Sequence, residues 1–294
     1  MKADLPTPRT EVAVAHLEGR TIYVAGGFTA DGEATGVVEA YDVADDSWER
    51  TVSLPVPLHH AGLASALGRL YVVGGYTSDG RASGGVWSWA PGDGEWRAQD
   101  PLPTPRGALA VATLNVADST VIHAVGGATG FGAGGAELSD ANEAFSLGRS
   151  EWLTRAALPF PRDHLAVAAT EGKLYVVGGR QLSLTTNQAR LDVYDPLEDR
   201  WTRGPDMPTA RGGLAAAAVD GRIAVVGGEQ PRGTFPEVEV FSVRRNAWVS
   251  LPPLPTPRHG LGAAGIGDRL YVVGGGPTPG LSVSGANETL LVKE

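Results

Sequence analysis

The sequence predicts an all-β protein that folds as a six-bladed β-propeller, and three repeated features support this prediction. A Gly-Gly pair closes an apolar run six times, with its first glycine at positions 26, 74, 126, 178, 227 and 274. The steps of 47 to 52 residues suit a four-stranded propeller blade. A tryptophan follows five of the pairs after 20 to 25 residues, at Trp48, Trp96, Trp152, Trp201 and Trp248. A turn that contains Pro-Arg, or a variant of it, then opens the next repeat.

Each repeat begins with a strand of small residues. Segments 11–17, 62–67, 165–170 and 260–266 are rich in Ala and Gly, as the narrow space near a propeller axis requires. A Tyr- and Val-rich strand that ends in Gly-Gly comes next. The third strand has an aromatic residue near its end, at 37–43, 86–91, 142–147, 191–196 and 238–243. The tryptophan opens the outer strand, and because one large ring recurs at the same place, we expect it to pack between adjacent blades.

The repeats fill the chain, which predicts one domain over residues 1–294. The expected blades are 9–54, 58–102, 106–158, 162–207, 211–254 and 258–294. The sixth blade lacks the tryptophan, so we expect residues 1–6 to complete it, since ADLPTPR at 3–9 matches LPTPR at 254–258. This closure joins the first and last blades and removes two open sheet edges.

The composition argues against several partners and chemistries. A net charge of −9 disfavours nucleic acid and anionic membranes, because phosphate binding needs a coherent positive field. The absence of cysteine excludes disulfides, thiolate metal sites and cysteine nucleophiles. No apolar run approaches the ~18 residues of a membrane span, and the first residues do not resemble a signal peptide. We expect a soluble, cytoplasmic monomer, with secretion open if a leader has been removed.

The turn before each inner strand is expected to lie at one mouth of the central channel. The six turns read PRTE (8–11), PLHH (57–60), PRGA (105–108), PRDH (161–164), ARGG (210–213) and PRHG (257–260). Five of them supply an arginine: Arg9, Arg106, Arg162, Arg211 and Arg258. The next two positions supply Glu11, His59, His60, Asp163, His164 and His259. Four of the six histidines fall in these turns, so the mouth is the main candidate for a functional site.

These histidines predict either a divalent metal site or a polar pocket. His60, His164 and His259 belong to blades two, four and six, a third of a turn apart in a six-fold ring. Three imidazoles with an open position are a recurrent metal arrangement, and Glu11 is a candidate fourth ligand or base. His59 and His60 are consecutive, so only one of them is expected to point inward. In the alternative interpretation, the histidines are pocket residues without a metal.

The five arginines also have two interpretations. Either they bind a ligand at the mouth, or each pairs with an acid that recurs in the third strand, namely Glu39, Glu143, Asp192, Glu239 and Glu288. Blade two has Leu58 in place of the arginine and Trp87 in place of the acid. The joint loss of both groups favours a structural pair.

The loops after the Gly-Gly pairs should reach the same mouth if successive strands alternate in direction. They begin with Phe28, Tyr76, Arg180 and Glu229 in blades one, two, four and five, and their varying lengths are typical of loops that set specificity. Tyr76 and Arg180 are candidate ligand contacts, as are His59 and His259 in the turns. The longest loop, 128–140, contains GFGAGG, which is similar to a dinucleotide-binding loop. No helix is expected after it, so a flexible loop is the better interpretation.

In its order of Gly-Gly, aromatic third strand and tryptophan, the chain resembles the Kelch-repeat family, and the likeness covers nearly all of it. The resemblance implies a binding module whose mouth holds an acidic peptide or an anionic small molecule.

The alternative is an enzyme that acts on a small polar or sugar-like substrate. Similarity to bacterial Kelch propellers of the sialic-acid mutarotase type implies an isomerase or epimerase. In that case His164 or His60 exchanges protons, Glu11 or Asp163 assists, and Arg106, Arg162 or Arg180 anchors a carboxylate. A metal-dependent lyase is the variant if the histidines bind a metal.

Overall fold

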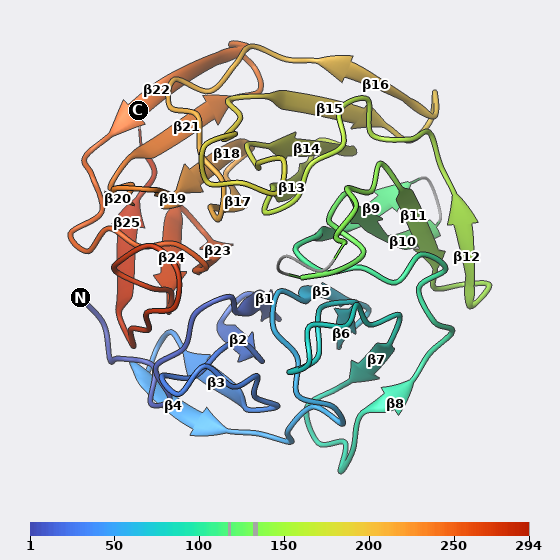
Figure 1. The fold of residues 1–294 in the computed structure, drawn as a ribbon, viewed down its shortest axis with the longest axis vertical. Coiled ribbons are helices and arrows are strands. Elements are labelled where there is room, and N and C mark those ends of the chain that lie inside the picture. Colours follow the sequence, from blue (N-terminus) through green and yellow to red (C-terminus); the bar gives the residue numbers. More distant parts are fainter. Residues whose placement is uncertain (117–118, 132–134, 294) are drawn as a thin grey trace.

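The structure is a computed structural model that describes residues 1–116, 119–131 and 135–293, and it confirms the six-bladed propeller. Six antiparallel sheets surround a central axis, along which Figure 1 looks. The described part of the chain contains no helix, and hence none that could cross a membrane. Positions 132–134, in the predicted flexible loop, lie outside the described residues, so that prediction stays a prediction.

Each blade runs from an inner strand at the axis to an outer strand at the rim (Figure 1). Blade one contains β1 (Ala13–Leu17), β2 (Thr21–Ala25), β3 (Val38–Asp42) and β4 (Ser47–Arg50). Blade two contains β5 (Gly62–Ala66), β6 (Arg69–Val73), β7 (Val86–Trp89) and β8 (Arg97–Ala98). Blade three contains β9 (Ala110–Val116), β10 (Ser119–Val125), β11 (Asn142–Ser146) and β12 (Glu151–Thr154).

The second half of the chain repeats this plan. Blade four contains β13 (Ala166–Thr170), β14 (Lys173–Val177), β15 (Leu191–Asp195) and β16 (Arg200–Arg203). Blade five contains β17 (Ala215–Val219), β18 (Arg222–Val226), β21 (Val238–Ser242) and β22 (Ala247–Leu251), with a small hairpin of β19 (Glu229–Gln230) and β20 (Gly233–Thr234) between its second and third strands. Blade six contains β23 (Gly262–Ile266), β24 (Arg269–Val273) and β25 (Asn287–Leu291).

The inner strands of neighbouring blades approach so closely that they require small residues. A Cβ added to Gly62 of β5 would lie 2.0 Å from the Cγ2 atom of Val111 in β9. A Cβ on Gly262 of β23 would lie 1.9 Å from Val14 Cγ2 in β1. The Ala- and Gly-rich inner strands therefore follow from the wedge shape of the blades.

The tryptophans join neighbouring blades, as predicted. The indole N–H of Trp96 donates to the carbonyl of Val52 in the preceding blade (3.0 Å). Equivalent bonds join Trp152 to Asp100, Trp201 to Ala156 and Trp248 to Pro205. Each indole thus ties the outer strand of its own blade to the segment that ends the previous blade.

The N-terminal segment takes the outer place in blade six, as predicted. The indole N–H of Trp48 donates to the carbonyl of Ala3 (2.8 Å), so Ala3 stands where other blades have the end of an outer strand. Beside β25, the Leu5 N–H donates to the carbonyl of Gly285 (2.7 Å) and the Lys2 N–H to that of Asn287 (2.9 Å). The described residues of blade six form three regular strands, and these short contacts complete it without a fourth.

The Gly-Gly pairs connect each blade to the next one. In every pair, the second glycine's N–H donates to the main-chain carbonyl of the residue at the arginine position of the following blade, at 2.8 to 3.0 Å. Both glycines of every pair have positive φ, which favours glycine. A Cβ on Gly74 would lie 2.5 Å from the carbonyl oxygen of Arg106. The motif that marks the repeat is therefore also the junction between neighbouring blades.

Candidate functional site

The five Pro-Arg arginines lie inside the blades and do not reach the mouth. All are fully buried, and each pairs with the acid of its own third strand: Arg9 with Glu39, Arg106 with Glu143, Arg162 with Asp192, Arg211 with Glu239 and Arg258 with Glu288. Burial lowers the pKa of Arg9 and Arg162 to about 10, so both stay charged at neutral pH. The prediction that these five arginines bind a ligand is therefore wrong, because buried ion pairs and main-chain carbonyls engage them. Blade two replaces the pair with Leu58, which is equally buried in an apolar cluster that contacts Trp87.

Six residues form a main-chain ring around the axis. They stand two positions after the arginine position of each blade, and we call them the ring residues: Glu11, His60, Ala108, His164, Gly213 and Gly260. All have a left-handed backbone, with φ between 49° and 70°. From His60 to Gly260, each N–H donates to the carbonyl of the preceding ring residue at 2.9 to 3.1 Å. The Val12 N–H closes the circle on the carbonyl of Gly260 (3.2 Å).

Three ring residues carry polar side chains at a conformational cost. Glycine adopts the left-handed conformation freely, and blades five and six use it. Any other residue there costs about 1–2 kcal/mol. Blades one, two and four nevertheless place Glu11, His60 and His164 at this position. Because strained residues cluster at functional sites, these three side chains are candidates for a functional role.

The loops after the Gly-Gly pairs hold the residues that precede the ring residues. Antiparallel bridges pair Thr10 with Phe28, His59 with Tyr76, Gly107 with Ala128, Asp163 with Arg180, Gly212 with Glu229 and His259 with Gly276. The same two-residue contact therefore recurs in all six blades. It brings the loops to the mouth that the alternation of strand direction predicts.

Glu11, His60 and His164 converge from blades one, two and four. His60 Nε2 lies 3.1 Å from Glu11 Oε2 and 3.1 Å from His164 Nε2. Burial lowers the pKa of His60 well below its usual range. Burial raises the pKa of Glu11, but His60, His259 and His164 outweigh this effect and hold that pKa well below its ordinary value. The cluster therefore combines an ionised carboxylate with two imidazoles.

The predicted cluster of three histidines is wrong. His259 Nδ1 contacts Glu11 Oε1 (3.2 Å), whereas His60 contacts Glu11 Oε2. The possible metal ligands form two groups among the described residues, one of Glu11, His60 and His164 and the other of Glu11, Glu229 and His259. The carboxylate of Glu11 lies between the imidazoles, and it takes the place that the third histidine would need.

Asp163 and His59 contact the Nδ1 atoms of the two cluster imidazoles, which face away from the centre of the cluster. His164 Nδ1 lies 2.5 Å from Asp163 Oδ2. Burial raises the pKa of Asp163, but His164, the Leu182 N–H and Arg180 outweigh it and lower that pKa. His59 Nδ1 lies 2.6 Å from His60 Nδ1, and the His59 ring stacks on Phe28 with centroids 3.9 Å apart. His59 is thus a buried partner of His60, and its prediction as a direct ligand contact is wrong.

His259, Glu229 and Arg180 form the other side of the mouth. His259 Nε2 lies within hydrogen-bond distance of the Thr278 carbonyl (3.1 Å) while Nδ1 faces Glu11. Burial lowers the pKa of His259, but the Glu11 and Glu229 carboxylates outweigh it and raise the pKa, which favours the imidazolium. Arg180 Nη1 donates to Glu229 Oε1 (2.7 Å), and its Nε lies 3.9 Å from Asp163 Oδ2. At the mouth, the carboxylates of Glu11, Asp163 and Glu229 therefore each have a cationic or hydrogen-bonding partner.

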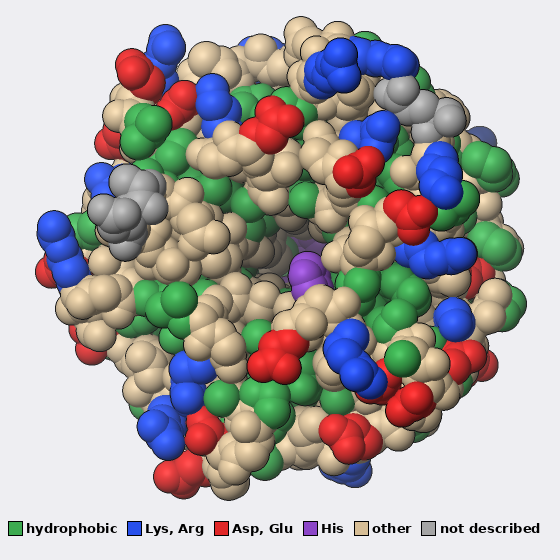
Figure 2. Space-filling model, turned by 180° about the vertical axis from the view of Figure 1, so that it is seen from behind, with side chains coloured by type: hydrophobic (Ala, Val, Ile, Leu, Met, Phe, Trp, Pro, Cys, Tyr) green, Lys and Arg blue, Asp and Glu red, His purple; other side chains and the backbone are tan. Residues whose placement is uncertain are grey.

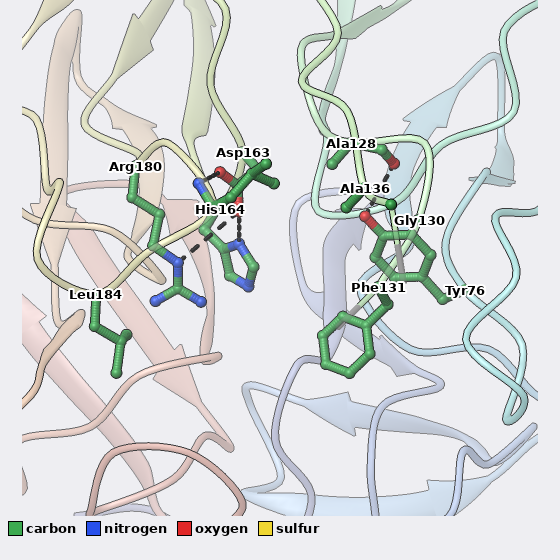
Figure 3. A pocket seen from close by; sticks show the side chains of 11 residues that line it. Tyr76, Ala128, Gly130, Phe131, Ala136, Asp163, His164, Arg180 and Leu184 are labelled. Carbon is green, nitrogen blue, oxygen red and sulfur yellow. Dashed lines mark hydrogen bonds and ion pairs between the residues drawn. The ribbon is translucent and has the colours of Figure 1, made fainter. Parts of the chain in front are cut away.

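Two neighbouring cavities open at this mouth. One has a volume of about 340 Å³ and is lined by Glu11, His60, His164, Arg180, Glu229 and His259, among others. The second, of about 490 Å³, shares His164, Arg180 and Phe131 with the first. Figure 3 shows His164 and Arg180 on one side of this second cavity and Tyr76 and Phe131 on the other.

A narrower space of about 90 Å³ adjoins the ring residues and their apolar neighbours, such as Leu109 and Leu165.

Figure 2 views the molecule from the reverse side of Figure 1, and a histidine is visible in the hollow at its centre. Acidic and basic side chains are interspersed around that hollow, without a patch of one sign.

Several lining residues are not among the predicted contacts, and Glu229, Phe131 and Leu281 are examples. Glu229 occupies the same position after Gly-Gly as Tyr76 and Arg180, so the alignment of the repeats carries a signal for it. Phe131 and Leu281 come from loops of unequal length, for which alignment offers no signal. Tyr76 lines the cavity with its ring, because its hydroxyl donates to the carbonyl of Ala128 (2.9 Å).

Comparison with known proteins agrees with this architecture. The Kelch motif matches residues 8–55 and 57–103, and the KLHDC2/KLHL20/DRC7 Kelch-repeats domain matches residues 101–275. The chain is 39% identical to F-box/kelch-repeat protein At1g16250 of Arabidopsis thaliana over 57 residues, which are 19% of this chain and 15% of that protein. It is 34% identical to Kelch-like protein 36 of Mus musculus over 64 residues, 22% of this chain and 10% of that protein.

These matches cover a small part of both relatives, so they show that the chain shares the repeat and do not extend to the activity of the whole proteins. Propellers of this kind typically bind proteins. With six blades, six Gly-Gly junctions and domain matches over more than half of its length, the chain belongs to the Kelch-repeat family.

Proposed function

We propose that this propeller binds a small anionic molecule at its channel mouth. The position of Arg180 carries the proposal, because this side chain lines both cavities and points into the space that Figure 3 shows. Its Nη1 donates to Glu229 Oε1, whereas no hydrogen bond or ion pair between described residues involves its Nη2. A guanidinium with a free N–H at a buried junction suits a carboxylate or phosphate group.

The size and charge of the mouth favour a small molecule over an acidic peptide. Volumes of about 340 and 490 Å³ fall in the range of small-molecule sites. The five Pro-Arg arginines are buried, so Arg180 and His259 are the cationic side chains that the described residues offer to a ligand in these cavities. One anionic group is therefore better matched to this site than a run of acidic residues.

The variant Arg180→Gln tests this proposal. Loss of a charge-assisted hydrogen bond should weaken binding of the anionic ligand by roughly 10- to 100-fold, and Arg180→Lys should recover part of that loss. Thermal-shift screening of small carboxylates, sugar acids and phosphates identifies the ligand, and calorimetry then gives its Kd. Arg97→Gln is the control, since Arg97 lies on β8 with an exposed side chain.

Two results would overturn the proposal: wild-type protein that no small anion stabilises, or an Arg180→Gln variant that binds the identified ligand as tightly as the wild type. If acidic peptides bind where small anions do not, the protein-binding alternative replaces it.

An enzyme that moves a proton on the same ligand is the second candidate, and the Asp163–His164 pair favours it. A carboxylate at His164 Nδ1 leaves Nε2 directed toward the cluster at the channel mouth, as in a histidine base held by an acid. An isomerase or epimerase of the kind that the sequence suggests needs such a base.

Proton exchange measures this second function directly. We expect wild-type protein in D2O to exchange a hydrogen of the bound ligand, followed by NMR, and His164→Gln to slow that exchange by at least about 100-fold. The same variant should still bind the ligand through Arg180. Exchange at the rate of buffer alone, with the ligand bound, would contradict an acid–base enzyme.

A further inference from the structure

The outer nitrogens of both cluster imidazoles are already engaged. An ionised carboxylate only accepts, so the contact with Asp163 assigns a hydrogen to His164 Nδ1. His59 Nδ1 lies 2.6 Å from His60 Nδ1, so this contact engages the outer nitrogen of the His60 ring. With both Nδ1 atoms engaged, each ring turns its Nε2 toward the inside of the cluster.

The inner atoms of the cluster are two imidazole nitrogens and one carboxylate oxygen that face one another. An imidazole nitrogen without a hydrogen and a carboxylate oxygen both present lone pairs. His60 Nε2 lies 3.1 Å from His164 Nε2 and 3.1 Å from Glu11 Oε2. Three atoms of this kind that converge on one point are a suitable ligand set for a metal ion.

The distances suit a metal ion. Ligands bonded to one ion at 2.0 to 2.2 Å are separated by roughly 2.8 to 3.6 Å, for bond angles between octahedral and tetrahedral values, and both 3.1 Å contacts fall in this range. All three ligand atoms lie within 4.8 Å of one another. Asp163 and His59 engage the outer imidazole nitrogens, as metal-bound histidines usually require. His259 occupies Glu11 Oε1 and leaves Oε2 to face the cluster.

We propose that Glu11, His60 and His164 bind one divalent first-row transition-metal ion at the channel mouth. Two imidazoles and one carboxylate favour zinc, iron, cobalt or manganese over calcium or magnesium. All three residues line the cavity of about 340 Å³, so the remaining coordination positions face the space in which Arg180 would hold an anion. All three side chains come from left-handed ring positions, which place them around one point at the channel mouth.

Titration with the metal alone tests this site. Tag-free protein is stripped with EDTA, titrated with Zn²⁺ by calorimetry, and titrated with Co²⁺ to follow its visible absorption. We expect one ion per chain, with affinity at least 100-fold weaker in His60→Ala and in His164→Ala. Asp163→Asn should weaken binding 10- to 100-fold. His16→Ala is the control, because His16 lies on β1 outside the cluster.

Glycine variants separate metal binding from folding. His60→Gly and His164→Gly place at the ring the residue that blades five and six already use, so they should fold and still lose the ion. The proposal is overturned if the folded wild type binds no stoichiometric metal, or if the His60→Gly, His164→Gly double variant binds it with unchanged affinity. The readout needs no organic ligand, so failure of the anion-binding proposal leaves it intact.

Discussion

Replacement of Gly74 with alanine is expected to destabilise the protein by about 3 kcal/mol or more. Gly74 has a φ of 66°, which alone costs a non-glycine residue about 1–2 kcal/mol. The new Cβ would also lie 2.5 Å from the carbonyl oxygen of Arg106, which accepts the Gly75 N–H at 2.9 Å. Relief of that contact requires the junction between blades two and three to open, and overpacking of a buried contact adds a further 1–3 kcal/mol or so.

Gly68→Ala is the matched control in the same blade. Gly68 has a φ of 74°, and a Cβ there meets nothing within 4 Å. This variant should therefore lose only the left-handed cost of about 1–2 kcal/mol. Urea unfolding followed by tryptophan fluorescence measures both changes. Equal losses in the two variants would show that the Gly-Gly pair acts through local turn conformation and not through the contact between blades.

Replacement of Arg106 with leucine is expected to cost roughly 3–5 kcal/mol, because it leaves the carboxylate of Glu143 buried without its partner. Arg106 is fully buried, and besides Glu143 it donates to the carbonyls of Gly126, Thr104 and Ala124, each at 2.8 Å. The loss should appear as a lower midpoint in urea with an unchanged slope.

The double variant Arg106→Leu, Glu143→Leu should recover most of that stability, to within about 2 kcal/mol of the wild type. Blade two is the natural precedent, since Leu58 stands at the arginine position and Trp87 at the acid position. Leucine is a better replacement for Glu143 than tryptophan. In blade two the indole of Trp87 lies over Gly85, where a Cβ would be 1.9 Å from the ring, so a tryptophan at this position needs a glycine beneath it. A double variant as unstable as Arg106→Leu alone would contradict this account of the pair.

Repetition explains why most of the fold was predictable. Landmarks that recur in five or six copies average out local ambiguity, so Gly-Gly, the tryptophans and the Pro-Arg turns set the register of every blade. The place of residues 1–6 followed in the same way, from the likeness of 3–9 to 254–258. Alignment also brought Glu11, His60, Asp163 and His164 into one set, and these residues do lie together.

Alignment of the repeats does not predict which of two residues in the same turn faces the channel mouth. Arg162 and His164 share one turn, yet Arg162 is buried in its blade and His164 lies at the mouth. His59 and His60 are adjacent, and only His60 faces the cluster. These differences arise because the backbone turns left-handed at the ring residue, which sends successive side chains in different directions.

The sequence by itself determined the number of blades, their order, the closure by the N-terminal segment and the turn type that gathers the histidines. Only the tertiary structure decided that Glu11 lies between His60 and His259, and that two imidazoles and one carboxylate form the cluster. Periodicity reports which residues are equivalent around the axis, because equivalent positions share a backbone. It does not predict how far each side chain extends. Where unlike side chains meet in one space, their lengths, charges and hydrogen bonds determine which of them contact each other.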